Sequence, residues 1–222
     1  MTAVLLAPGC GSGDTGQRKA FVDFLQTRVL DKPGMHVPQL TADERASFGD
    51  YADDFAIITD FNKTMNDSVS PKLAAAVGAG SIASLEDVVA HRAQLQTAKT
   101  GMAAMSRALD ADIARADAAH GKLDQPADLK QVYDKAYDRL VTQPATAFKA
   151  VVPVMDKVLG ETIDLGGYLD AHRSAIRISG SMVQTSDATV RAAINDRLQA
   201  LQANQRAVQT AQAKMQSAVY GR

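Results

Sequence analysis

The chain has 222 residues, of which 46% are hydrophobic and 22% charged, which is the usage of an ordinary globular protein and argues against global disorder. Its 24 Lys and Arg residues nearly balance its 25 Asp and Glu residues, so no long-range field favours binding to nucleic acid. A single cysteine excludes an internal disulfide and any multi-cysteine zinc or iron–sulfur site.

That cysteine, Cys10, follows an apolar run, Val4-Leu5-Leu6-Ala7, and the small residues Pro8 and Gly9. An apolar stretch that ends in small residues before a cysteine is typical of bacterial lipoprotein signal segments, in which the cysteine becomes the acylated first residue. We therefore expect residues 1–10 to be a remnant of such a segment, with Cys10 as the lipidation site, and residues 11–15 to be a flexible spacer. Because the apolar run is shorter than a full signal segment, the alternative is a cytosolic helical adaptor with a free Cys10 thiol.

Apolar residues recur three and four apart along most of the remaining chain, which predicts amphipathic helices. The first helix begins at Gln17 and ends before the turn signal Lys32-Pro33-Gly34. A capping box at Thr41-Ala42-Asp43-Glu44 predicts the start of a second helix, which continues to about residue 69. Ser70-Pro71 is expected to kink or end it.

The second half of the chain shows the same periodicity. Ser84 is a predicted N-cap for one long helix that continues to about Lys122. Pro126 is suited to the first turn of the next helix, and Pro144 and Pro153 are expected to interrupt the chain after it. Helical spacing returns from residue 154 to about residue 176, with Gly166-Gly167 as a weak point.

The last helix is expected to start at Ser186 or Asp187 and to end near residue 219. Its apolar residues repeat every seven positions, at Ile194, Leu201, Val208 and Met215. Residues 178–184, just before it, fit no element.

Three predicted segments, 42–69, 85–122 and 187–219, would each be about 40 to 55 Å long at the standard helical rise. No convincing pair of alternating strands is present. The predicted fold is therefore all-α, an elongated helical bundle of five or six helices without a sheet, in which residues 16–222 form a single helical domain.

Residues Gly11-Ser12-Gly13-Asp14-Thr15-Gly16 match the glycine pattern of dinucleotide-binding folds. That pattern binds phosphates only within a βαβ unit, with an acidic residue on a second strand about 20 positions later. The segment after the first predicted helix has no such strand, so neither a nucleotide partner nor another cofactor is expected.

Two Asp–His pairs each share a predicted helical face, Asp87 with His91 and Asp117 with His120. About 43 Å of helix would separate the pairs, so they cannot form one site, and no metal is expected. An alternative is a hydrolase or a metal-dependent enzyme with an interhelical site near Asp117 and His120. The acidic residues Asp50, Asp53 and Asp54 are expected to face solvent, and no Gly-x-Ser-x-Gly motif is present.

Several segments in order and spacing resemble the YiaF-type family of Gram-negative lipoproteins, which contains a domain of unknown function. The segments are Gln17-Arg18-Lys19-Ala20-Phe21, Phe24-Leu25-Gln26, Leu40-Thr41-Ala42-Asp43, Phe48-Gly49, Asp117-Ala118-Ala119-His120, Asp128-Leu129-Lys130 and Val132-Tyr133-Asp134.

The resemblance implies an envelope lipoprotein, acylated at Cys10 by fatty acids such as palmitate and held in the membrane by those chains. It brings no catalytic residues, so the expected role is protein interaction or structural support, with an envelope protein as partner. Gly11 after the cysteine, in place of Asp, implies the periplasmic face of the outer membrane.

Overall fold

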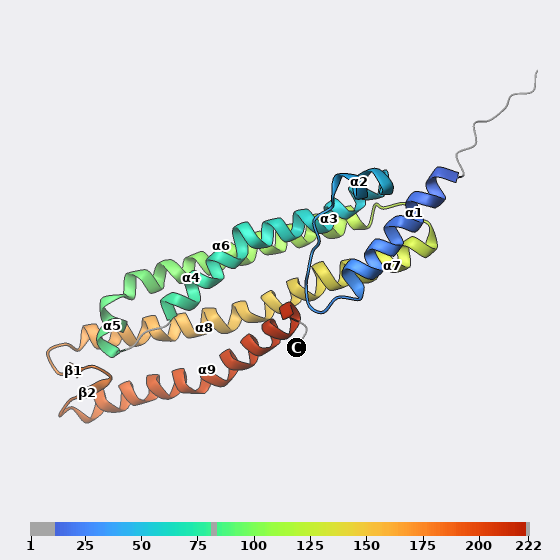
Figure 1. The fold of residues 1–222 in the computed structure, drawn as a ribbon. Helices are drawn as coiled ribbons and strands as arrows, with labels where there is room; N and C mark the ends of the chain where they lie inside the picture. The colour runs from blue at the N-terminus through green and yellow to red at the C-terminus, as the bar shows by residue number, and fades with distance from the viewer. Residues whose placement is uncertain (1–11, 81–83, 221–222) are drawn as a thin grey trace, which may run out of the picture.

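A computed structural model of the chain describes residues 12–80 and 84–220. The protein is mostly α-helical, as predicted, and its long helices run alongside one another (Figure 1). The α-helices are α1 (Ser12–Phe24), α2 (Ala42–Phe48), α3 (Tyr51–Thr64), α4 (Ser70–Gly80), α5 (Leu85–Ala90), α6 (Arg92–His120), α7 (Ala127–Tyr137), α8 (Gln143–Ala171) and α9 (Ala188–Tyr220). Three π-helical turns, η1 (Leu25–Leu30), η2 (Met65–Val69) and η3 (Asp138–Thr142), join some of them.

Aromatic side chains hold α1, α2, α3 and α7 together at one end of the molecule. Phe21 of α1 is fully buried, and five other rings surround it with centroids 5.3 to 6.4 Å away, those of Phe24, Phe48, Tyr51, Phe55 and Tyr133. The apolar face predicted for the first helix is therefore the face that packs.

The long helices α6, α8 and α9, together with the shorter α4, form the other part of the molecule. Helix α8 packs against α6 on one side and along α9 on the other, and α4 packs against α6 (Figure 1). The predicted stripe of α6 is buried, including Leu95, Met102 and Leu109. Of the heptad positions in α9, Ile194 is buried whereas Val208 and Met215 are half-buried.

Three predicted helix starts are confirmed. In the capping box, the Thr41 hydroxyl accepts a hydrogen bond from the amide of Glu44, and the Glu44 carboxylate accepts one from the amide of Thr41. The Ser84 hydroxyl accepts from the amide of Asp87. Of the two residues proposed for α9, Asp187 is the cap, because its carboxylate accepts from the amide of Thr189.

Two segments predicted as single helices are each divided. The segment 42–69 breaks at Gly49, whose φ of +56° lies in the left-handed region that favours glycine. The segment 85–122 breaks at His91, where the backbone leaves helical geometry between α5 and α6. The described residues therefore contain seven uninterrupted helical segments, more than the five or six predicted.

The predicted interruptions at Pro144 and Pro153 are wrong, and Pro71 does not end its helix, because the chain stays helical through all three prolines. A proline in a helix lacks an amide donor, and its ring crowds the carbonyl four residues earlier. For Pro71 and Pro144 that carbonyl lies within η2 and η3, respectively. We infer that these wider turns relieve the crowding and allow each helix to continue.

The prediction that the protein has no sheet is also wrong. Strands β1 (Arg177–Ser179) and β2 (Met182–Gln184) form an antiparallel hairpin, in the segment to which the sequence assigned no element. Gly180 makes the turn with a φ of +61°, and its carbonyl accepts a hydrogen bond from the amide of Leu85. The half-buried Ile178 and Val183 pair across the strands and pack on a second apolar cluster between α5, α8 and α9.

Within the described residues, no helix combines the length and the apolar character needed to cross a membrane.

Candidate functional site

The predicted lipidation site, Cys10, lies outside the described residues, and the structure begins two positions later with α1. Residues 12–15 belong to α1, so the prediction of a flexible spacer over residues 11–15 is wrong for these four. Asp14 lies in the first turn, where a negative charge stabilises the helix N-terminus. Its carboxylate also accepts a hydrogen bond of 2.8 Å from the Tyr51 hydroxyl.

The start of α1 is therefore fastened to the rest of the protein. Burial, together with the hydrogen bond to Asp14, raises the pKa of Tyr51 to about 12, so its hydroxyl stays protonated as a donor at neutral pH. One turn further on, Arg18 forms an ion pair of 3.4 Å with Asp128 at the start of α7.

The glycine pattern near Cys10 begins α1 directly. Gly16 lies inside the helix, and the strands in the described part of the chain are those of the antiparallel hairpin. The parallel sheet that a dinucleotide site needs is therefore missing from the described residues.

Asp117 and His120 do lie close together at the end of α6, but they have different partners. The His120 Nε2 atom is 2.8 Å from the Asp134 carboxylate of α7, whereas the Asp117 carboxylate accepts a 2.7 Å hydrogen bond from the Tyr137 hydroxyl. The His120 ring stacks on Tyr137 with a centroid separation of 4.1 Å. These contacts join α6 to α7.

Asp134 is the charged centre of this contact. Partial burial by itself would raise its pKa, but hydrogen bonds from Lys130 and His120, together with their positive charges, hold the pKa below its usual value. Lys130 lies one turn earlier on α7 and donates to both carboxylate oxygens at 2.9 Å. The carboxylate thus remains ionised and bound to its neighbours, rather than poised as a proton donor.

The second pair, Asp87 and His91, has a local structural role. The Asp87 carboxylate accepts a hydrogen bond from the Ser84 hydroxyl, and the His91 Nδ1 atom lies 3.0 Å from the Asp87 backbone oxygen. In the described part of the chain no three His, Cys, Asp or Glu residues are grouped so that they could hold a metal ion. The structure therefore does not favour the metal-dependent alternative.

Asp54 differs from the solvent-facing residue that the sequence predicts. Asp50 and Asp53 are exposed, as expected, but Asp54 is half-buried and its carboxylate accepts a hydrogen bond from Gln125. The Tyr133 hydroxyl donates to its backbone oxygen at 2.6 Å. Desolvation raises the pKa of Asp54 despite the hydrogen bond, so the fold holds this carboxylate at a cost.

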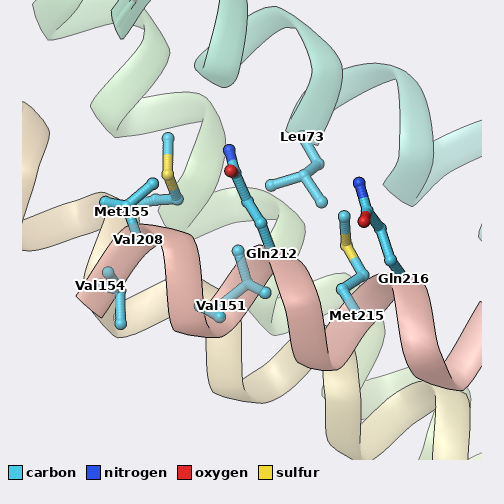
Figure 2. A pocket seen from close by; sticks show the side chains of 9 residues that line it. Leu73, Val151, Val154, Met155, Val208, Gln212, Met215 and Gln216 are labelled. Carbon is cyan, nitrogen blue, oxygen red and sulfur yellow. The ribbon is translucent and has the colours of Figure 1, made fainter. Parts of the chain in front are cut away.

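An apolar cavity of about 230 Å³ lies where α4, α8 and α9 meet (Figure 2). Below, this space is called the α9 cavity, and its walls are formed by Leu73 of α4, Val151, Val154 and Met155 of α8, and Val208, Ala211, Gln212, Met215 and Gln216 of α9. The sequence predicts Val208 and Met215 as apolar positions of the last helix, but the cavity itself depends on how three helices meet.

Two larger and more open grooves lie elsewhere on the described surface. One, of about 440 Å³, lies between α6 and α8 beside Pro153. Its rim includes Lys149, which forms an ion pair with Asp110, and Asp156, which forms one with Lys99. The other, of about 350 Å³, lies between α5 and the hairpin, beside Arg173. Neither brings together a set of catalytic side chains.

The protein is thus mostly helical, and the polar residues described above form hydrogen bonds and ion pairs between its helices. Comparison with protein families places it more closely: residues 1–216 match the model of the family described as "Protein of unknown function (DUF3053)", and the chain belongs to this family.

Its curated relatives include the "Uncharacterized protein YiaF" of Escherichia coli strain K12 and of Shigella flexneri. Each is 30% identical over 182 residues, which cover 82% of this chain and 77% of the relative. No solved structure gives a significant match. The resemblance noted in the sequence is thus confirmed at the level of the family, whose molecular function is not known.

Proposed function

We propose that the protein is a lipid-anchored module of the bacterial cell envelope, attached to a membrane through acyl chains on Cys10, with a binding role rather than a catalytic one. The observation that carries the proposal is the apolar run followed by small residues and Cys10. In this view the long helices form an elongated bundle that presents its surface to an envelope protein.

The docking of α1 gives the anchor a mechanical consequence. Only Gly11 separates Cys10 from Ser12, and consecutive Cα atoms are 3.8 Å apart, so the first residue of α1 would lie within about 8 Å of the acylated residue. Because Tyr51 and Arg18 fasten the start of α1, the anchored protein would stand close to the headgroups, with the α1, α2 and α7 end nearest the membrane.

Acyl chains bind to a bilayer with about 0.8 kcal/mol per buried methylene, so two or three chains hold a protein stably without a spanning helix. Such an anchor also favours partner proteins in the same membrane, because the anchored protein and its partner are then both confined to that membrane. The neutral overall charge fits this proposal, since the attachment then rests on the acyl chains rather than on electrostatic attraction.

The test is metabolic labelling of cells that express the natural gene, with and without Cys10→Ser. We expect the unchanged protein to incorporate labelled palmitate and to fractionate with membranes, and the Cys10→Ser variant to lose both properties. Ser12→Ala is a matched control two positions away and should behave as the unchanged protein. Membrane association and labelling that persist in Cys10→Ser would disprove the lipid anchor.

A second variant addresses which membrane carries the protein. Gly11 implies the outer membrane, whereas Asp at this position retains lipoproteins in the inner membrane. On a density gradient we therefore expect the unchanged protein with the outer membrane and Gly11→Asp with the inner membrane. Equal distribution of the two proteins would refute the outer-membrane assignment while leaving the lipid anchor intact.

A further inference from the structure

The α9 cavity is an apolar space that side chains from three helices partly enclose. Figure 2 shows Leu73 reaching into it from α4, opposite the α9 side chains, with α8 forming the floor. Its volume of about 230 Å³ exceeds that of an apolar cavity of about 150 Å³ in another protein, which stays dry and binds benzene or xenon. The cavity is thus large enough for a small apolar ligand.

The chemistry of the walls restricts the kind of ligand. None of the nine lining residues is charged, although 22% of the whole chain is. Two of the apolar walls are methionines, Met155 and Met215, whose flexible thioethers adapt to the shape of a chain-like ligand. An ionised group inside such walls would lose its hydration without finding a counter-ion, which is unfavourable.

Two amide side chains provide the polar contacts. Gln212 and Gln216 are one turn apart on α9 and extend in Figure 2 from the α9 ribbon toward the helix that carries Leu73. Gln212 is half-buried and Gln216 is exposed, so both amides lie at the open rim of the cavity, where no hydrogen bond joins them to another residue within 12–80 and 84–220. A free amide donates and accepts, so this pair suits an uncharged head group such as a hydroxyl or an ester.

Two apolar residues of α9 that line the cavity are only partly covered by the rest of the protein. Val190 and Ile194, near the start of the helix, are buried, whereas Val208 and Met215, which line the cavity, are only half-buried. A ligand in the cavity would cover the latter two and would bridge α9 to α4 through Leu73.

We propose that the α9 cavity binds the alkyl chain of a single-chain amphiphile with an uncharged head, with Gln212 and Gln216 binding the head. The proposal goes beyond the lipid anchor and does not depend on it, because every residue it uses lies in α4, α8 or α9. Binding fixes the second half of α9 against α4, so occupancy is coupled to the order of this helix.

The test uses the purified full chain and N-phenyl-1-naphthylamine, a neutral apolar fluorophore, displaced by 1-decanol or by decanoate. The chain has no tryptophan, so the signal of the probe is free of tryptophan emission. We expect 1-decanol to displace the probe with a saturable curve. Ionised decanoate, which has the same chain length, should bind at least tenfold more weakly, because the walls hold no cation.

Variants locate the site. Ala211→Leu fills the cavity from a buried position, and Val208→Phe fills it from a half-buried one, so each should raise the dissociation constant of 1-decanol at least tenfold. Ala213→Leu makes the same change at an exposed position of α9 that does not line the cavity, and should leave binding unchanged. If Ala211→Leu fails to fold, Val208→Phe decides.

Hydrogen exchange gives an independent readout, because 1-decanol should slow exchange over residues 205–216 and leave α1 unaffected. The proposal is overturned if neither filling variant weakens binding, if Ala213→Leu weakens it equally, or if decanoate binds as well as 1-decanol. It is also overturned if sedimentation shows a dimer that Ala211→Leu dissociates, because a second copy of the chain would then cover the cavity.

Discussion

Gly166 and Gly167 are adjacent in α8, yet we expect alanine at the two positions to change stability in opposite directions. A β-carbon at Gly166 would lie 3.0 Å from both the backbone oxygen and the Cγ1 atom of Val88 in α5. A β-carbon at Gly167 would approach no closer than 3.7 Å, to a nitrogen of the flexible Arg92 side chain. One glycine therefore sets the spacing of two helices, and the other does not.

The magnitudes follow from two effects. In a helix interior alanine is more favourable than glycine by about 0.5 to 1 kcal/mol, and at Gly167 nothing opposes this gain. At Gly166 the new methyl group meets backbone, which yields only if α5 shifts, and overpacking of this kind costs about 1 to 3 kcal/mol. We expect Gly167→Ala to raise the free energy of unfolding by about 0.5 to 1 kcal/mol, and Gly166→Ala to lower it by about 1 kcal/mol.

Thermal unfolding followed by circular dichroism measures both variants against the unchanged chain. For a protein of this size 1 kcal/mol corresponds to about 2 to 4 °C in the melting temperature, which is well resolved. Urea titration checks that both variants unfold in a single transition, so that the free energies are comparable. If Gly166→Ala raises the melting temperature as much as Gly167→Ala does, the close approach of α5 to α8 is refuted.

Four further predictions concern single side chains of α1, α3 and α7 and the cap of α2. Phe21→Ala should lower the free energy of unfolding in urea by about 3 to 5 kcal/mol, because it empties the centre of the aromatic cluster, whereas the exposed Lys19→Ala should change it by less than about 0.5 kcal/mol. Thr41→Ala should cost about 1 kcal/mol and speed hydrogen exchange over α2, and unchanged exchange would contradict the role of the capping box. Burial raises the pKa of Asp54 in the folded protein, so the folded state binds this proton more tightly than the unfolded chain does. The folded state therefore loses stability as the pH rises. Asp54→Asn should stabilise the protein at pH 7 and lose this advantage at about pH 3. The pKa of Asp134 is lower in the folded protein, so this carboxylate stabilises the fold above the unfolded pKa of about 3.9. That stabilisation disappears as the pH falls through the folded pKa. Asp134→Asn should therefore destabilise the protein at pH 7 but not at pH 2.

The parts of the fold that the sequence predicts correctly rest on local signals. The side chains of Thr41 and Ser84 cap the helices that follow them, because each contacts an amide only three positions away. The stripe of α6 needs nothing beyond its own periodicity to identify Leu95 and Met102 as core residues.

The parts that the sequence does not predict depend on neighbours distant in the chain. Asp54 appears as a surface residue in its own helix, and only contacts from Gln125 and Tyr133, 71 and 79 positions away, bury it. The same holds for the α9 cavity, which needs three helices. The sequence does not predict the hairpin for another reason: each of its strands has only three residues, too few to show an alternating pattern. Gly180, between Ile178 and Val183, is a usable turn signal.

The π-helical turns explain why buried residues on both sides of them are spaced four positions apart. Residues four apart in an α-helix drift by about 40° around its axis, so a series of such steps would carry an apolar row away from the core. Yet two long rows in steps of four are buried throughout, Phe61, Met65, Val69 and Leu73 across η2, and Leu129, Tyr133, Tyr137, Val141 and Ala145 across η3. The wider turn absorbs the accumulated angle and returns the row to the same side. Removing one residue from η2 would therefore convert it to an ordinary α-helical turn and leave Leu73 facing the α9 cavity, because the wider turn already accommodates about one residue more than an α-helix does.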